Sequence, residues 1–200
     1  HRVWKKDLIF WMSPKENKNL IDVASGTGDI AKLFSKLTNN KSKVLCIDPN
    51  KKMLSKGKEK LSNLKNIRWK IGSAENLPVN DDCYEYYSIS FGLRNTKNIG
   101  KSLSEAFRVL KPGGRFFCLE FSKVENENLD LLYSNYSKFL PLVGKLVLGD
   151  SMPYKYLTES IKNFIDQKTL IELMKKNGFE NCSYRNLSGG VAAIHSGWKI

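Results

Sequence analysis

Short apolar segments alternate with amphipathic segments through most of the first 121 residues. The helical period is clearest near the middle of the chain, where Ile99, Leu103, Ala106, Phe107 and Leu110 fall on one stripe. The pattern predicts strands at 19–24, 43–48, 67–71, 84–90 and 115–121, and helices at 29–37, 51–62 and 97–110. Alternation of this kind implies an α/β fold with a parallel sheet and helices on both of its faces.

The end of the chain follows a different pattern. Asp166 is placed to cap a helix at 167–177, and Gly178 is placed to end it. Two strand-like segments follow, joined through Ser188-Gly189-Gly190, which is a hairpin signal. These segments are 181–187 and 190–197. The sheet is therefore expected to finish in an antiparallel hairpin.

An insertion at 122–165 separates the predicted parallel strands from the last helix. Its apolar residues recur at helical spacing: Leu129, Leu132, Tyr136, Phe139, Leu140, Val143 and Val147. Core packing explains such a face. The alternative is a helical lid over an apolar acceptor pocket, because insertions here lie above the strand ends where ligands bind. We find no linker or repeat, so we expect a single domain over 1–200.

Two acids flank a glycine turn after the first predicted strand. Asp22 ends the strand, Ser25-Gly26-Thr27-Gly28 forms the turn, and Asp48 ends the second strand. Glycines allow close backbone approach, and a carboxylate can accept two hydroxyl hydrogen bonds. We therefore expect a nucleotide-like cofactor over the turn, with its ribose bound by Asp48. The plainer interpretation is an ordinary strand–helix turn with two unconnected acids.

The same residues favour S-adenosylmethionine (SAM) over a dinucleotide. Asp22 would repel a pyrophosphate but can bind the ammonium group of a methionine moiety. Ser73 and Ala74 follow the third predicted strand, where a backbone amide can meet an adenine edge. A parallel sheet that ends in an antiparallel hairpin is also typical of SAM-dependent methyltransferases. We expect the cofactor to contact Asp22, Ser25, Gly26, Thr27, Gly28, Asp48, Pro49, Met53, Ser73, Ala74 and Ser90.

The charge is unusually basic, with 33 Lys and Arg against 20 Asp and Glu, a net +13. Such a charge attracts a nucleic acid or an anionic membrane surface, although lysine drift in an AT-biased genome also explains it. The four dispersed cysteines form no metal-binding pattern, so we expect no metal and a reducing compartment. No signal peptide or spanning segment is visible. The chain begins His-Arg-Val-Trp without a Met, and we expect a segment upstream of it.

The fourth predicted strand ends in Ser90-Phe91-Gly92-Leu93-Arg94-Asn95, at the position that faces the methyl group in this fold. Enzymes that methylate the amino nitrogen of a base often carry Asn/Asp-Pro-Pro-Tyr/Phe there. The difference counts against N-methylation of adenine or of glutamine. No cysteine stands in the Pro-Cys setting that the covalent route to pyrimidine C5 requires.

Six strings resemble those of the ubiquinone/menaquinone biosynthesis C-methyltransferase family. They are Asp22-Val-Ala-Ser-Gly-Thr-Gly-Asp29, Ser90-Phe-Gly-Leu-Arg-Asn95, Arg108-Val-Leu-Lys-Pro-Gly-Gly114, Leu119-Glu-Phe-Ser-Lys123, Tyr154-Lys-Tyr-Leu-Thr-Glu-Ser-Ile161 and Gly190-Val-Ala-Ala-Ile-His195. The resemblance covers essentially the whole chain. It implies a Rossmann-like class I methyltransferase with a mostly parallel seven-stranded sheet and an antiparallel last strand. The upstream segment that helps to cover the site in this family is absent from the sequence.

The resemblance implies methyl transfer from SAM to a ring carbon of a polyprenylated benzoquinol or demethylmenaquinol. A ring carbon becomes nucleophilic as the phenol loses its proton, and an ordinary phenol has a pKa of about 10. The site must lower that pKa or supply a base. Arg94 is the first candidate, as a cation beside the phenolate or as the holder of a base, and Glu120 is the second. The plainer interpretation of Arg94 is a solvated residue or a structural ion pair.

Other side chains are candidates for contact with the quinol. Besides Arg94, they are Phe91, Asn95, Tyr154 and Tyr156. The tyrosines are equally well explained as surface aromatics before a helix. His195 could act as a base, but a buried strand histidine away from the methyl group explains it better.

The polyprenyl tail predicts peripheral contact with an anionic membrane. We expect a cytoplasmic enzyme at the inner membrane or, alternatively, one at the matrix face of the mitochondrial inner membrane. We expect the chain to form a homodimer or to join a quinone-biosynthesis complex. We do not expect it to bind a nucleic acid. Two competing functions are an RNA methyltransferase, motivated by charge, and a non-catalytic SAM-binding scaffold.

Overall fold

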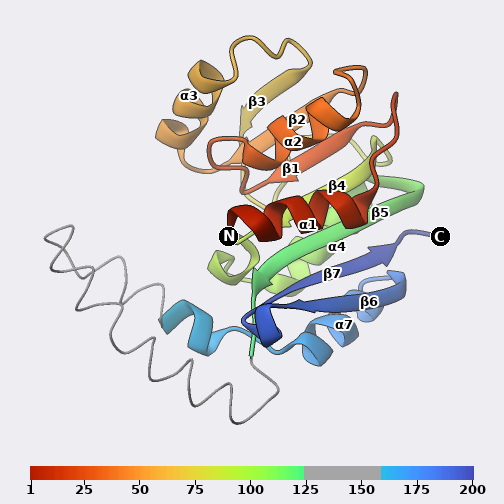
Figure 1. The fold of residues 1–200 in the computed structure, drawn as a ribbon. Helices are drawn as coiled ribbons and strands as arrows, with labels where there is room; N and C mark the ends of the chain where they lie inside the picture. Colours follow the sequence, from red (N-terminus) through yellow and green to blue (C-terminus); the bar gives the residue numbers. More distant parts are fainter. Residues whose placement is uncertain (124–158) are drawn as a thin grey trace, which may run out of the picture.

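The protein is described here by a computed structural model that covers residues 1–123 and 159–200. Seven strands form one sheet in the order β3-β2-β1-β4-β5-β7-β6 (Figure 1). Strands β1 to β5 run parallel, whereas β7 runs antiparallel to both of its neighbours. The expected mostly parallel sheet with an antiparallel last strand is confirmed. The strands are β1 Leu20–Val23, β2 Val44–Asp48, β3 Ile67–Ile71, β4 Tyr84–Ser90, β5 Leu110–Phe121, β6 Glu180–Leu187 and β7 Ala192–Trp198.

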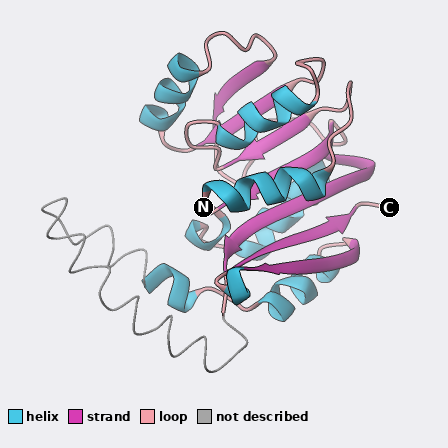
Figure 2. Cartoon of the chain, viewed as in Figure 1, coloured by secondary structure: helices cyan, strands magenta, loops and turns pink. Residues whose placement is uncertain are grey.

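Helices cover both faces of the sheet (Figures 1 and 2). Helices α1 and α2 lie in front of it in Figure 1, whereas α4 and α7 lie behind it. Helix α3 packs beside β2 and β3. The helices are α1 Arg2–Met12, α2 Asp29–Leu37, α3 Lys51–Lys60, α4 Ile99–Val109 and α7 Gln167–Lys176, with short 3-10 turns η1 Leu93–Asn95 and η2 Ser188–Gly190. Within the described residues, no helix has the length and apolar character needed to span a bilayer.

Two apolar clusters, one on each face, hold these layers together. Behind the sheet, Leu103 and Ala106 of the predicted α4 stripe are fully buried, and they pack with Leu170 and Met174 of α7. In front, the apolar side chains of α1 and α2 pack on Phe117 and its neighbours. Burial of this kind stabilises by about 25 cal/mol per Å² of apolar surface, which is why the stripe faces the sheet.

The predicted start and stop signals of the last helix are confirmed. Asp166 accepts a hydrogen bond from the Thr169 N–H at 2.8 Å and so caps α7. Gly178 follows the helix at φ +93°, a conformation that costs a residue with a side chain about 1–2 kcal/mol. A Cβ there would also lie 3.0 Å from the ring of Phe107. The backbone conformation and the packing therefore both require glycine at position 178.

Two elements differ from the prediction. Strand β5 starts at Leu110, directly after α4, and so begins five residues before the predicted strand at 115–121. Its register with β4 shifts before Arg115, so this added part of the strand is irregular. Helix α1 has no counterpart among the predicted elements. Its apolar residues Trp4, Leu8, Ile9 and Met12 do follow a helical period, so the signal was present.

Helix α1 is tied to the far end of the chain. The Trp4 indole Nε1 donates to Ser188 Oγ at 2.9 Å, in the turn between β6 and β7.

The predicted insertion at 122–165 falls mainly on residues 124–158, which lie outside the described residues. Tyr154 and Tyr156 lie in this range too.

Candidate active site

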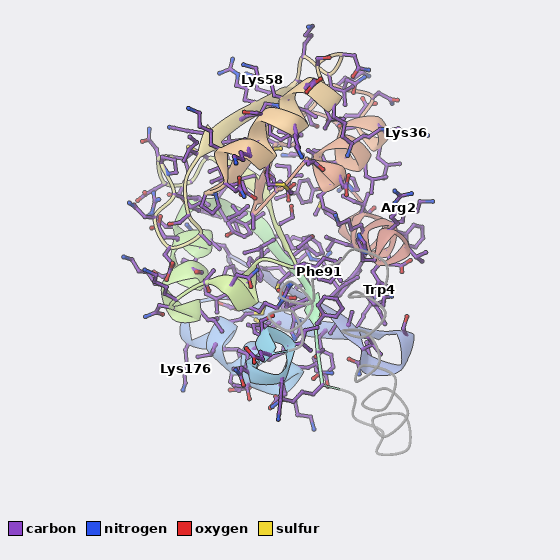
Figure 3. The ribbon with its side chains drawn as sticks, turned by 90° about the vertical axis from the view of Figure 1, so that its left-hand side faces the viewer. Arg2, Trp4, Lys36, Lys58, Phe91 and Lys176 are labelled. Carbon is purple, nitrogen blue, oxygen red and sulfur yellow. The ribbon has the colours of Figure 1, made fainter. Side chains whose placement is uncertain are left out.

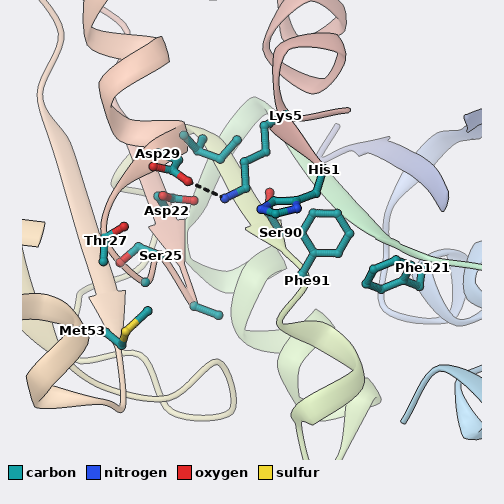
Figure 4. Close-up of a pocket in the computed structure, with 13 residues that line it drawn as sticks. His1, Lys5, Asp22, Ser25, Thr27, Asp29, Met53, Ser90, Phe91 and Phe121 are labelled. Carbon is teal, nitrogen blue, oxygen red and sulfur yellow. Dashed lines mark hydrogen bonds and ion pairs between the residues drawn. The ribbon is translucent and has the colours of Figure 1, made fainter. Parts of the chain in front are cut away.

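A cavity of about 380 Å³ opens at the carboxyl ends of β1 and β4 (Figure 4). The strand order reverses between these two strands, and ligands of open α/β sheets bind at such a switch point. The lining comes from α1, from β1 and its turn, from the start of α2, from α3, and from the ends of β4 and β5. The lining residues are His1, Lys5, Asp22, Ala24, Ser25, Gly26, Thr27, Asp29, Ile30, Met53, Ser90, Phe91 and Phe121.

The glycine turn forms the floor of this cavity. Gly26 has φ +55°, and a Cβ built on it would meet only Met53 Cε at 3.5 Å, so the turn leaves open space on the cavity side. Gly28 has φ +78°, and a Cβ there would lie 2.6 Å from Trp69. Glycine is therefore required at position 28 by close packing against Trp69 of β3, and it does not line the cavity.

Asp48 joins the turn to the end of β2. Its Oδ2 accepts the Gly26 N–H at 2.9 Å, and its Oδ1 accepts the Asn50 N–H at 2.8 Å. A carboxylate has about four acceptor positions, so capacity for hydroxyl donors is left. Of the expected cofactor contacts, Gly28, Asp48, Pro49, Ser73 and Ala74 lie outside the cavity lining, and their cofactor contacts stay predictions.

Asp22 supplies a buried acid with a free oxygen. The side chain is almost fully buried, and its Oδ1 accepts a hydrogen bond from Ser88 Oγ at 2.7 Å. Among the described residues, Oδ2 has no hydrogen-bond partner, and the buried Ser90 Oγ on the neighbouring strand has none either. Burial raises the pKa of Asp22 to about 7, against the opposing effects of Ser88 and Lys5. A ligand that carries an ammonium group would satisfy Oδ2, so the residues present fit the methionine moiety of SAM.

A lysine from α1 points into the same cavity (Figure 4). Lys5 Nζ lies 2.8 Å from Asp29 Oδ2, and Lys60 Nζ lies 2.7 Å from Asp29 Oδ1. Partial burial works to raise the pKa of Asp29, but the two lysines outweigh it and bring the pKa to about 2. Sequence reasoning missed Lys5, although the helical period of α1 would have placed it beside Trp4 on the protein-facing side.

Aromatic rings form the wall opposite the acid. The Phe91 and Phe121 ring centroids lie 5.0 Å apart, and Trp4 lies 6.2 Å from Phe91 and 6.0 Å from Phe121. Figure 3 shows Trp4 of α1 and Phe91 after β4 side by side. Phe91 has φ +56°, which is rare for an aromatic residue, and such strain clusters at functional sites. Phe91 was a predicted site residue, whereas Trp4 and Phe121 were not.

The two predicted catalytic residues lie next to this wall and form a buried ion pair. Arg94 Nη1 lies 2.6 Å from Glu120 Oε1, with side-chain exposures of 8% and 1%. Arg94 Nη1 also donates to the Phe91 carbonyl at 2.7 Å, and its guanidinium lies 5.3 Å from the Phe121 ring centroid. Burial raises the pKa of Glu120, and Arg94 opposes the rise. Neither residue lines the cavity, so direct contact with a substrate stays a prediction for both.

The remaining candidates are spread over the molecule. Asn95 follows Arg94 in η1, and its amide Nδ2 lies 3.5 Å from the Phe91 carbonyl. His195 lies inside β7, where its Nε2 is 3.2 Å from the Gln167 carbonyl and burial lowers its pKa to about 4. That placement fits the interpretation as a buried strand histidine away from the site.

Comparison with known proteins shows the family of this chain and which solved structures share its fold. The profile of the ubiE/COQ5 methyltransferase family matches residues 1–199. A ubiquinone/menaquinone biosynthesis C-methyltransferase UbiE of Brucella canis is 45% identical, over 100% of this chain and 77% of its own length. That of Brucella anthropi is 46% identical, over 100% of this chain and 78% of its own length. The crystal structure of a SAM-dependent methyltransferase from Aquifex aeolicus shares the fold, with a TM-score of 0.73, 17% identity, and coverage of 98% of this chain and 89% of that chain. A free acidic oxygen and an aromatic wall at the switch point thus occur in a chain that belongs to the ubiE/COQ5 methyltransferase family.

Proposed function

We propose that this chain is a C-methyltransferase that uses SAM to methylate a ring carbon of a prenylated benzoquinol or demethylmenaquinol in ubiquinone/menaquinone biosynthesis. One observation carries the proposal beyond family membership. A single cavity presents the free Oδ2 of Asp22 on one side and the rings of Phe91 and Phe121 on the other. That pairing suits a cationic cofactor beside a flat, apolar acceptor.

The cofactor would be held from one side of the cavity. Asp22 Oδ2 would accept from the ammonium group, and the backbone at Gly26 leaves room for close approach. Ser90 Oγ supplies a further unpaired polar group on β4. When bound, SAM supplies an electrophilic methyl group.

The acceptor ring would be held by the aromatic wall. Paired aromatic rings favour offset or edge contacts with a further ring at centroid distances of 4.5–7 Å. Phe91, Phe121 and Trp4 also exclude water from the reacting carbon, which strengthens the electrostatic interactions in the site. The wall therefore orients the quinol and keeps its surroundings apolar.

Arg94 and Glu120 act as one unit in this proposal. Their ion pair fixes the turn after β4, because Arg94 donates to the Phe91 carbonyl while Glu120 Oε2 accepts the Arg94 N–H at 3.3 Å. The permanent cation beside Phe121 would also stabilise negative charge as the phenol loses its proton. We therefore assign Arg94 as a residue that positions Phe91 and favours the phenolate.

The charge supports peripheral contact with an anionic membrane as part of the same proposal, because a polyprenyl tail dissolves in lipid. We propose that the enzyme acts at the cytoplasmic face of an inner membrane or at the matrix face of the mitochondrial inner membrane. There it would act as a homodimer or within a quinone-biosynthesis complex. Figure 3 shows Lys36, Lys58 and Lys176 on α2, on α3 and at the end of α7, in separate parts of the surface. That spread gives no support to an RNA-binding stripe.

The test is incubation with methyl-labelled SAM and a reduced short-tail demethyl-benzoquinol, with demethylmenaquinol in parallel. We expect carbon-bound label on one of the two quinols, located by mass spectrometry. No label on either quinol, with SAM binding measured by calorimetry, would overturn the proposed acceptor and favour a scaffold role.

A further inference from the structure

Helix α1 places one cation inside the candidate cofactor cavity. Lys5 lines the cavity, its side chain is 18% exposed, and Nζ lies 2.8 Å from Asp29 Oδ2 (Figure 4). No other lysine or arginine lines this cavity among the described residues. Its neighbour on the helix, Lys6, is exposed and does not line the cavity.

The methionine moiety of SAM is a zwitterion, so its site needs two opposite charges. Asp22 has a free Oδ2 that suits the ammonium group, but an acid cannot receive the carboxylate. Lys5 lies close enough to Asp22 for its charge to act on that carboxyl. The cavity therefore offers an acid and a cation side by side.

Asp29 has a second lysine partner, so Lys5 can leave it for a ligand without leaving the acid unpaired. It binds two lysines, Lys5 on Oδ2 and Lys60 on Oδ1 at 2.7 Å. If Lys5 turned to a ligand carboxylate, Asp29 would keep Lys60. Asp29 would then stay paired with Lys60, and Lys5 with the ligand carboxylate, so no charge of the group would lose its partner, which limits the cost of the exchange.

We propose that Lys5 binds the carboxylate of the SAM methionine moiety and that α1 is thereby part of the cofactor site. The inference rests on the proposed function only for its cofactor and is independent of the acceptor. It also gives a role to a helix outside the sheet, because Lys5 lies on a turn of α1 that lines the cavity. Binding of the cofactor would hold α1, and with it Trp4 of the aromatic wall, against the strand ends.

The test compares SAM with decarboxylated SAM, which keeps the sulfonium, the adenosine and the amine but lacks the carboxylate. Binding is measured by calorimetry without any quinol. For the unaltered chain we expect SAM to bind ten- to hundredfold more tightly, the range of one charge-assisted hydrogen bond. Equal affinities for the two ligands would overturn the proposal without any variant.

Three variants separate binding from a structural role. Lys5→Met should weaken SAM binding ten- to hundredfold and leave decarboxylated SAM nearly unaffected. Lys6→Met removes the same charge from the next position of α1 and should keep the preference for SAM. Asp29→Asn frees Lys5 and should keep that preference too. If Lys5 only anchors α1 through Asp29, Lys5→Met and Asp29→Asn will weaken both ligands equally, and the proposal fails.

The outcomes also distinguish this inference from the proposed function. Absence of SAM binding by the unaltered chain would remove the cofactor assignment and this inference together. Normal SAM binding with the expected ligand preference, but no methylated quinol, would leave Lys5 in its role and reject only the acceptor.

Discussion

The backbone N–H of Gly26 donates to Asp48 Oδ2 at 2.9 Å, so the turn after β1 and the acid after β2 are joined by a hydrogen bond. The same carboxylate accepts the Asn50 N–H through Oδ1. The acid expected to bind ribose therefore also sets the shape of the turn on which the cofactor would lie.

Asp48→Asn should lower both stability and SAM affinity. The amide nitrogen cannot accept, so one of the two backbone donors loses its acceptor, at a cost of about 1–3 kcal/mol. Urea unfolding and calorimetry with SAM measure the two effects. Asn50→Asp is the control, because aspartate caps α3 as well as asparagine does. An Asp48→Asn variant as stable as the control would contradict the prediction.

Asp22 should make stability fall as pH rises. Folding raises the pKa of Asp22 from 3.8 to about 7. Between these values the folded chain holds a proton that the unfolded chain has released, so this contribution to the unfolding free energy decreases from about pH 4 to about pH 7 and is constant above. The stability of Asp22→Asn relative to that of the unaltered chain should therefore be higher at pH 8 than at pH 5. Parallel stability curves for the two proteins would argue against it.

The same group should control SAM affinity in the opposite sense. Only the ionised carboxyl attracts an ammonium group, so SAM affinity should rise through pH 7 and then level off. Calorimetry at several pH values should show this rise in the unaltered chain and a flat, weaker profile in Asp22→Asn. A rise that persists in the variant would assign the effect to another group.

The Arg94–Glu120 pair should behave as a unit. Arg94→Met leaves Glu120 buried without its partner, and such a loss costs about 3–5 kcal/mol. Adding Glu120→Gln removes the unpaired charge and should recover much of that stability. Urea unfolding of the unaltered chain, both single variants and the double variant measures the coupling. Additive losses would show that the two side chains act independently.

Turnover should respond differently from cofactor binding. The pair adjoins the aromatic wall and lies outside the cavity lining, so Arg94→Met with Glu120→Gln should keep SAM affinity nearly unchanged while methyl transfer collapses. Calorimetry and the labelled-methyl assay give the two values. Wild-type turnover in the double variant would reject the role of Arg94.

Phe91 offers a matched pair of substitutions. Glycine ordinarily lowers the stability of a folded chain relative to alanine. At φ +56°, however, any residue with a Cβ pays about 1–2 kcal/mol of conformational energy that glycine avoids. Phe91→Gly should therefore be about 1 kcal/mol more stable than Phe91→Ala in urea unfolding. Both variants lack the ring, so both should lose quinol methylation. The reverse stability order would mean that the backbone relaxes after the ring is removed.

Local patterns predicted most of the fold. Helix α2 has the expected bounds, and Asp166 caps α7 as expected, because capping and periodicity are properties of neighbouring residues. The meeting of Arg94 with Glu120, 26 positions apart, depends on β4 and β5 being adjacent. Periodicity of the single segments does not give their order in the sheet.

The site was predictable only in part for the same reason. The glycine turn and Asp22 follow from a local string, whereas the approach of Lys5 to Asp29 depends on how α1 crosses the sheet. The apolar spacing of Trp4, Leu8 and Met12 could have revealed the helix. It could not have shown that Lys5 of this helix lines the cavity.

The antiparallel strand β7 has a consequence for biosynthesis. It lies between β5 and β6, yet it follows every other described strand in the chain. Until it emerges from the ribosome, the edge of β5 that pairs Phe117 with Ser196 and Leu119 with Ile194 has no neighbour. An apolar, unpaired edge is a template for association with other chains. The nascent protein should therefore depend on chaperone protection until β7 has been translated, and ribosomes stalled shortly before Ala192 should carry an aggregation-prone chain.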